Sequence, residues 1–145
     1  MSEVLSREEI FFILREIVVE CVGCEHEEVT PEANFRYDLG GESIDDLDLM
    51  FRCEKRFGLR LRFQDLQNPS LWERDNSGHL SGESLNRMRQ LFPNLDLSDL
   101  ESHSGPVSPH DFLKIKRIVQ LIEQAQATAA LGKVTTRNEV APQSV

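Results

Sequence analysis

Ser43 is the side chain in this sequence whose surroundings best suit covalent chemistry. It follows two adjacent glycines and opens an acidic, amphipathic stretch, in the segment DLGGESIDDLDL from Asp38 to Leu49. Paired glycines permit a tight turn and the close approach of another molecule. No histidine stands beside the serine in the sequence to act as its base. The pattern therefore favours a hydroxyl that another enzyme modifies over a serine that catalyses its own reaction.

A helix after the glycine pair must position this serine. The spacing of apolar residues predicts a helix with Ser43 as its N-cap, running to Phe57 and ending near Gly58. Asp45 and Asp46 in its first turn complement the helix dipole. The apolar residues form two stripes, a core-facing one of Leu49, Cys53 and Phe57 and a second one of Ile44, Leu47 and Phe51. A helix with two apolar faces needs a second covering surface, either the rest of the domain or a partner.

Helical patterns flank this segment on both sides. The capping box SREE starts a first helix after Ser6, and its apolar pattern fades near Gly23. A short helix is predicted within 60–67, before Asn68 and Pro69. The polar stretch that follows, to about residue 105, contains a further helix that starts after Ser81 and stops by Pro93, and then a loop from Asp96 to Pro106.

The last predicted helix has Ser108 as N-cap and Pro109 at its first position. Its apolar face consists of Phe112, Ile115, Val119 and Ile122. We predict an all-α fold, a four-helix bundle with an extra helical insertion between the second and last helices. It forms one domain over 1–127, with the insertion at about 70–105, and the small, polar residues of 128–145 form a disordered tail.

Composition restricts the class of partner. The chain has 145 residues, a net charge of -9 and an isoelectric point near 4.9. This charge argues against nucleic acid and anionic membrane surfaces as partners. The sequence has no apolar run long enough to span a membrane, and its start does not resemble a signal peptide. Three cysteines without a signal peptide indicate a reducing compartment, so we expect a cytoplasmic protein without disulfides.

The segment from Phe35 to Leu61 resembles the phosphopantetheine attachment site of acyl carrier proteins. The residues that carry the resemblance are Asp38, Leu39, Gly40, Ser43, Ile44, Asp45, Leu47, Asp48, Leu49, Glu54 and Phe57. It implies that the chain is not an enzyme, and that a phosphopantetheinyl transferase attaches 4'-phosphopantetheine from coenzyme A to Ser43. The arm would carry acyl or related thioesters in fatty-acid, polyketide or specialised lipid biosynthesis. The resemblance leaves the identity of the cargo open.

The resemblance also implies a docking face for enzymes with basic patches. Its residues would be Asp38, Glu42, Ile44, Asp45, Asp46, Leu47, Asp48 and Phe51. The sequence departs from the family in two main ways. The later part of the second helix and the residues after it are basic, with Arg52, Lys55, Arg56, Arg60 and Arg62. The insertion is also much longer than the usual link, which suggests a specialised carrier that stands alone.

Other interpretations of these residues remain open or are weaker. The chain could be an unmodified helical interaction module that uses the same face of the second helix. Glu73 to Ser84 nearly matches a calcium loop, but the twelfth position is serine where a bidentate carboxylate is needed. Ser84 lies in SGESL, which lacks the flanking acids of an attachment site. Cys21 and Cys24 have no second cysteine pair and the histidines are scattered, so we expect no metal site. Nothing in the sequence supports a Ser-His-Asp arrangement, so we expect no catalytic residues.

Overall fold

A computed structural model describes residues 4–102 and 109–143, and these residues contain helices and two isolated backbone bridges but no strand. The long helices are α1 (Arg7–Val22), α2 (Ser43–Phe57), α3 (Gly82–Leu91) and α6 (Ile115–Gln143). The short ones are η1 (His26–Glu28), η2 (Phe63–Gln67), η3 (Pro69–Leu71), α4 (Ser98–Ser102) and α5 (Pro109–Phe112). The all-helical prediction is confirmed.

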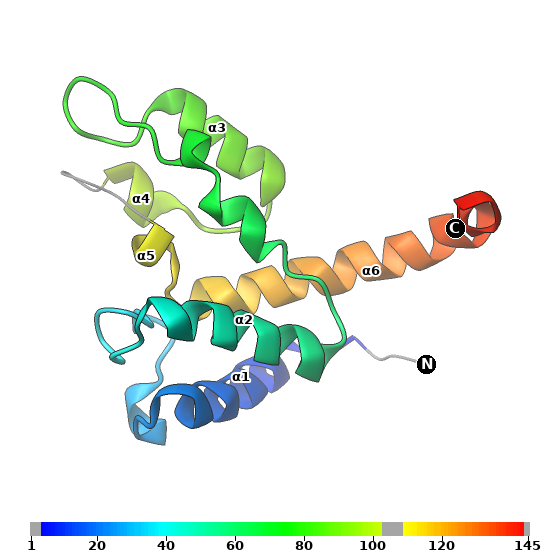
Figure 1. The fold of residues 1–145 in the computed structure, drawn as a ribbon, viewed down its shortest axis with the longest axis horizontal. Helices are drawn as coiled ribbons and strands as arrows, with labels where there is room; N and C mark the ends of the chain where they lie inside the picture. The colour runs from blue at the N-terminus through cyan, green and yellow to red at the C-terminus, as the bar shows by residue number, and fades with distance from the viewer. Residues whose placement is uncertain (1–3, 103–108, 144–145) are drawn as a thin grey trace.

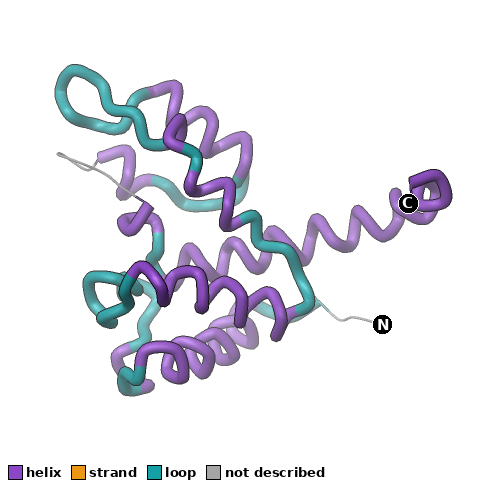
Figure 2. The backbone as a smooth tube through the Cα atoms, in the orientation of Figure 1, coloured by secondary structure: helices purple, strands orange, loops and turns teal. Residues whose placement is uncertain are grey.

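The helices are arranged around α6. In Figure 1, α1 and α2 lie together on one side of the molecule, and α3 and α4 of the insertion lie on the other. Figure 2 shows the long path from α2 to α3, in which loops alternate with short helical turns. Helix α1 contacts both α2 and α6, and α3 contacts η3. The buried side chains of both groups belong to one continuous hydrophobic cluster, so the insertion shares its core with the helices around Ser43.

Local signals set most helix ends as predicted. The Ser6 hydroxyl accepts the backbone N–H of Glu9 at 3.1 Å, and the Glu9 carboxylate accepts the N–H of Ser6 at 2.8 Å. Gly23 and Gly58 end α1 and α2 in the left-handed conformation, with φ of 76° and 68°. The Ser81 hydroxyl caps α3 through the N–H of Ser84.

The start of α2 and the last helix differ from the prediction. Glu42, not Ser43, is the N-cap of α2, so Ser43 is the first helical residue. The helix predicted from Pro109 is broken into α5 and α6 by Leu113 and Lys114. These two residues pair with the chain before α2: the carbonyl of Leu113 accepts the N–H of Phe35 at 2.8 Å, and Lys114 forms a backbone bridge. The predicted cap, Ser108, lies outside the described residues.

Two segments predicted to be irregular are helical. A short helix, α4, lies within the loop expected from Asp96 to Pro106. Helix α6 continues past Ala127 to Gln143, where the sequence analysis expects a disordered tail. The alanines at the start of that stretch are exposed and bury little surface, but alanine has the highest helix propensity. Small side chains there were therefore not evidence for disorder. The division of the chain into a domain of 1–127 and a tail stays a prediction.

A buried arginine connects α6 to the insertion. The side chain of Arg117 is fully buried, and its guanidinium forms an ion pair with Asp99. It also donates to the carbonyls of Asp96, Asp111 and Phe112 at 3.2, 3.3 and 3.0 Å. Five donors in a rigid plane allow one arginine to satisfy several acceptors at once. The junction between α5 and α6 is therefore held to the segment that contains α4.

Aromatic side chains reinforce the same junction. Phe112 is fully buried, with the Trp72 ring edge-on at 6.5 Å and the Phe92 ring at 5.7 Å between centroids. Trp72 and Phe92 both belong to the insertion, so Phe112 packs between it and the start of α6. Hydrogen bonding continues this contact, since the Gln124 side chain donates to the carbonyl of Leu91 at 3.0 Å.

Candidate functional site at the start of helix α2

Two glycines shape the turn before Ser43 for different reasons. Gly40 has φ of 81°, a left-handed conformation that a side chain would strain. Gly41 packs against the ring of Phe35, and a Cβ atom added there would lie 2.5 Å from the nearest ring carbon. The Gly41 N–H also donates to the carbonyl of Phe35 at 2.9 Å. The turn is thus fixed by conformation at its first glycine and by close packing at its second.

Ser43 emerges from this turn as an exposed residue. None of the described residues forms a hydrogen bond with its hydroxyl. The N–H groups of Asp45 and Asp46 donate to the carbonyl of Glu42 at 2.8 and 3.1 Å. The N–H groups of Ser43 and Ile44 have no acceptor within the described part of the chain. The hydroxyl therefore stands at a helix N-terminus whose first two donors are free for an anion.

The neighbouring acids also hold the turn together. The Asp45 carboxylate accepts the N–H of Glu42 at 2.9 Å, and the Asp38 carboxylate accepts the N–H of Asn34 at 2.7 Å. Asp48 pairs with Arg52 four residues later, at 3.0 Å. Each acid keeps a solvent-facing side. The acids that were predicted for docking thus also stabilise the local structure.

The structure does not place Asp46 on the surface, as its predicted role in a docking face requires. Its side chain is buried and bonds to the Arg36 guanidinium at 2.7 Å. Burial, the largest influence, raises the pKa of the Asp46 carboxyl, and the Arg36 guanidinium opposes that rise. A carboxylate enclosed in this way cannot contact a partner directly, so we leave it out of the docking face.

The second apolar stripe of α2 is left uncovered by the described residues. The side chains of Ile44, Leu47 and Phe51 are 74%, 62% and 63% exposed. On the opposite side, Leu49 and Cys53 are fully buried in the core. Large apolar side chains that share a helix face with acids form a surface suited to another protein. The helix therefore has the two distinct faces that its sequence predicts.

The sequence analysis missed the residues that anchor the turn. The Asn34 side-chain oxygen accepts the N–H groups of Arg36 and Tyr37, at 2.8 and 2.9 Å, and its amide donates to the carbonyl of His110 at 3.0 Å. Asparagine that bonds to backbone two residues ahead is a known turn signal, so this part was available from sequence. The Arg36–Asp46 pair and the contact with α5 depend on tertiary packing and left no such signal.

Comparison with known proteins agrees with this geometry. Residues 13–73 match the family described as "Phosphopantetheine attachment site". A relative named acyl carrier protein, from Rubrobacter xylanophilus, is 40% identical over 57 residues, which are 39% of this chain and 70% of the relative. The chain belongs to the acyl carrier protein family. Members of this family are carriers and not catalysts, and their prosthetic group is 4'-phosphopantetheine, which a phosphopantetheinyl transferase attaches.

The weaker candidates for chemistry find no support in the structure. Ser84, in the segment that echoes the carrier motif, is fully buried and donates to the carbonyl of Ser70 at 2.6 Å. Within the described residues no group of three acids, histidines or cysteines could hold a metal ion. Burial raises the pKa of the Cys21 thiol to about 12, so it remains protonated and unreactive. No helix within the described ranges combines the length and apolarity needed to cross a bilayer.

Proposed function

We propose that Ser43 carries the phosphopantetheine arm and that the chain transports acyl or related thioesters in fatty-acid, polyketide or specialised lipid biosynthesis. The observation that carries this proposal is the exposed Ser43 hydroxyl, displayed after two constrained glycines within the family match. The free thiols of Cys21, Cys24 and Cys53 support a reducing location such as the cytoplasm.

The residues around Ser43 fit a phosphate-linked arm. The Ser43 oxygen would hold the phosphate, and the free N–H groups of Ser43 and Ile44 lie at the positive end of the α2 dipole. When attached, the arm supplies the thiol that forms the thioester. The chain itself supplies an accessible hydroxyl, a rigid helix end and a surface for the enzymes that act on the cargo.

We propose that this surface combines the exposed stripe of α2 with the acids beside it. Its residues are Asp38, Glu42, Ile44, Asp45, Leu47, Asp48 and Phe51. Partners with basic patches would be attracted by the acids and would bury the apolar side chains. Because the acids are near the surface, this attraction should weaken as salt rises.

Phe51→Asp tests the docking surface. The change should slow phosphopantetheine transfer by about tenfold, since an aromatic side chain buried at an interface contributes more than about 1 kcal/mol to binding. Phe12→Asp on α1 is the matched control, because Phe12 is similarly exposed, at 57%, on a different helix. Transfer rates at several salt concentrations provide the measurement. Equal slowing in both variants would show that the charge, and not the α2 surface, is responsible.

The attachment itself is tested by intact mass spectrometry. After incubation with coenzyme A and a broad-specificity phosphopantetheinyl transferase, the wild-type chain should gain the mass of one phosphopantetheine group. An unchanged mass, with circular dichroism showing a folded chain, would contradict the proposal.

A helical interaction module that is never modified is the second candidate, favoured by the exposed stripe of Ile44, Leu47 and Phe51. It predicts partner binding without any mass gain. Replacing Ser43 by alanine would leave its activity intact, whereas Phe51→Asp would abolish it.

A further inference from the structure

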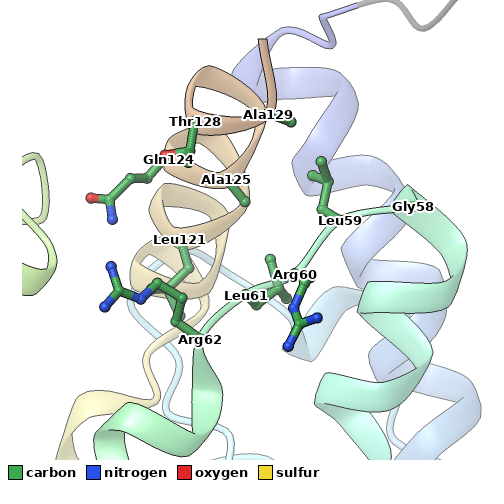
Figure 3. A pocket seen from close by; sticks show the side chains of 10 residues that line it. All are labelled: Gly58, Leu59, Arg60, Leu61, Arg62, Leu121, Gln124, Ala125, Thr128 and Ala129. Atoms are coloured by element: carbon green, nitrogen blue, oxygen red, sulfur yellow. The ribbon is translucent and has the colours of Figure 1, made fainter. Parts of the chain in front are cut away.

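A second candidate site lies at the opposite end of α2 from Ser43. A pocket with a volume of about 440 Å³ opens between the segment Gly58–Arg62 and the first half of α6 (Figure 3). Its volume is within the range of small-molecule sites, roughly 300–1,000 Å³. Helix α2 has 15 residues, which at about 1.5 Å per residue place the pocket roughly 22 Å from Ser43. It is therefore separate from the attachment turn.

The walls of the pocket are mainly apolar. Leu61 and Leu121 are buried at 2% exposure each and form a floor that is continuous with the core. Ala125 and Ala129 project from α6 toward the Gly58–Arg62 segment, and their small size leaves the space between the two elements open (Figure 3). Leu59 closes the end nearest to Ala129. An aliphatic chain would bury apolar area on both sides of this space.

Two arginines supply positive charge at the rim. The Arg62 guanidinium lies on the side of Leu121 and Gln124, and the Arg60 guanidinium lies on the side of α2 (Figure 3). Arg62 forms an ion pair with Asp65 through its Nε atom at 2.8 Å, and within the described residues its terminal nitrogens form no hydrogen bond, so they can still donate to a second anion. Arg60 is exposed, and no acidic side chain in the described ranges lies within ion-pair distance of it. The rim therefore has unused capacity to bind an anion.

The backbone at the rim is strained. Arg62 has φ of 59°, the one positive φ outside glycine within the described residues. A side chain in the left-handed region costs of order 1–3 kcal/mol and persists where the surrounding structure or a function requires it. The Arg62 guanidinium lies toward α6, where it borders the apolar space (Figure 3).

We propose that this pocket binds an amphiphilic anion, an unbranched aliphatic chain that ends in a carboxylate or a phosphate. The chain would lie between Leu61 and Ala125, and the anionic head would bond to Arg62 in the field of Arg60. The proposal does not depend on Ser43, because neither the pocket nor its arginines belong to the attachment turn. It gives the carrier a non-covalent site besides its arm.

Calorimetric titration with decanoate, kept below the concentration at which it forms micelles, tests the proposal. Saturable binding of one molecule is expected, and decanol should bind at least tenfold more weakly because hydrogen bonds to charged groups contribute about 1.5–3 kcal/mol. Ala125→Leu should abolish binding by filling the space. Decyl phosphate and anionic phospholipid vesicles form two further arms, which separate a free amphiphile from a membrane surface as the source of the anion.

A matched pair of double variants separates the site from general attraction. Arg60→Gln with Arg62→Asn removes both rim charges, and asparagine tolerates the left-handed backbone. This double variant should bind decanoate at least tenfold more weakly than the wild-type chain. Lys55→Gln with Arg56→Gln removes the same charge from exposed positions of α2 outside the pocket, and should change the affinity less than about twofold. Circular dichroism checks that all variants fold.

The proposal fails on any of four results. Absence of saturable decanoate binding to the folded wild-type chain would contradict it directly. Equal losses in the two double variants, or unchanged binding in folded Ala125→Leu, would place the ligand elsewhere. Binding to vesicles without binding to monomeric decanoate or decyl phosphate would show a membrane surface contact instead of a pocket. All measurements can also be made on Ser43→Ala, so failure of the attachment proposal would leave this test intact.

Discussion

Ser43→Ala is expected to abolish phosphopantetheine attachment completely while leaving the fold unchanged. The Ser43 hydroxyl is exposed, and no described residue bonds to it, so its removal costs no internal contact. Because Glu42 is the N-cap of α2, the helix also loses no cap. Intact mass after incubation with transferase and coenzyme A should show no gain, whereas the midpoint of urea denaturation should match the wild type.

Ser84→Ala provides the reverse control. Its hydroxyl is buried, donates to the carbonyl of Ser70 and accepts the N–H of Glu73 at 3.1 Å. Removing it should lower the free energy of unfolding by about 1–3 kcal/mol, yet the variant should still accept one phosphopantetheine group. A mass gain in Ser43→Ala would show that Ser43 is not the attachment site. Absence of the mass gain in folded Ser84→Ala would indicate that Ser84 is needed for attachment.

Arg117→Met should lower the free energy of unfolding by about 2–4 kcal/mol, because leaving a buried acceptor without its donor costs about 1–3 kcal/mol and more than one acceptor is affected. The methionine fills much of the space but leaves the carbonyls of Asp96 and Phe112 without the donor they have now, whereas the half-buried Asp99 keeps its ion pair with Lys114 at 3.5 Å. Urea denaturation followed by circular dichroism measures the change. A loss below about 1 kcal/mol would show that the Arg117 side chain is not enclosed as the structure describes.

Two further variants complete this test. Arg7→Met removes an arginine whose partner, Glu123, lies at 3.0 Å on the surface, and should cost less than about 1 kcal/mol. Combining Arg117→Met with the change of its half-buried partner, Asp99→Leu, removes both charges of the pair, so that neither is left without the other. The double variant should therefore recover part of the stability that the single change loses.

The sequence predicted helix ends better than it predicted tertiary roles. Ser6, Gly23, Gly58 and Ser81 act locally, through backbone conformation or a bond within one turn, and their positions were predicted. Ser43 was misplaced by one position because its neighbour, Glu42, can also begin a helix. The apolar face of the last helix was predicted, but its division at Leu113 was not, since that break satisfies backbone groups of a segment nearly 80 residues away.

The candidate site shows the same limit. Helix periodicity predicted that Ile44, Leu47 and Phe51 form a stripe apart from the core-facing one, but left open whether the rest of the domain covers it; the structure leaves it exposed. The burial of Asp46 requires its partner Arg36. Arginine is rarely buried without a partner, and the buried Arg117 has Asp99 as its partner. In both cases the partner comes from another element, so that spacing along one helix could not identify it.

The position of Arg117 also determines how this carrier can be engineered. Excising the insertion of about 70–105 to obtain a minimal carrier would remove Asp99 and leave a charged guanidinium facing a newly exposed apolar surface around Phe112. A shortened or chimeric carrier would need a redesigned inner face at the start of α6, with an apolar residue in place of Arg117. Conversely, the insertion could not be transplanted alone onto another carrier, because Asp99 would lose its partner Arg117, which belongs to α6.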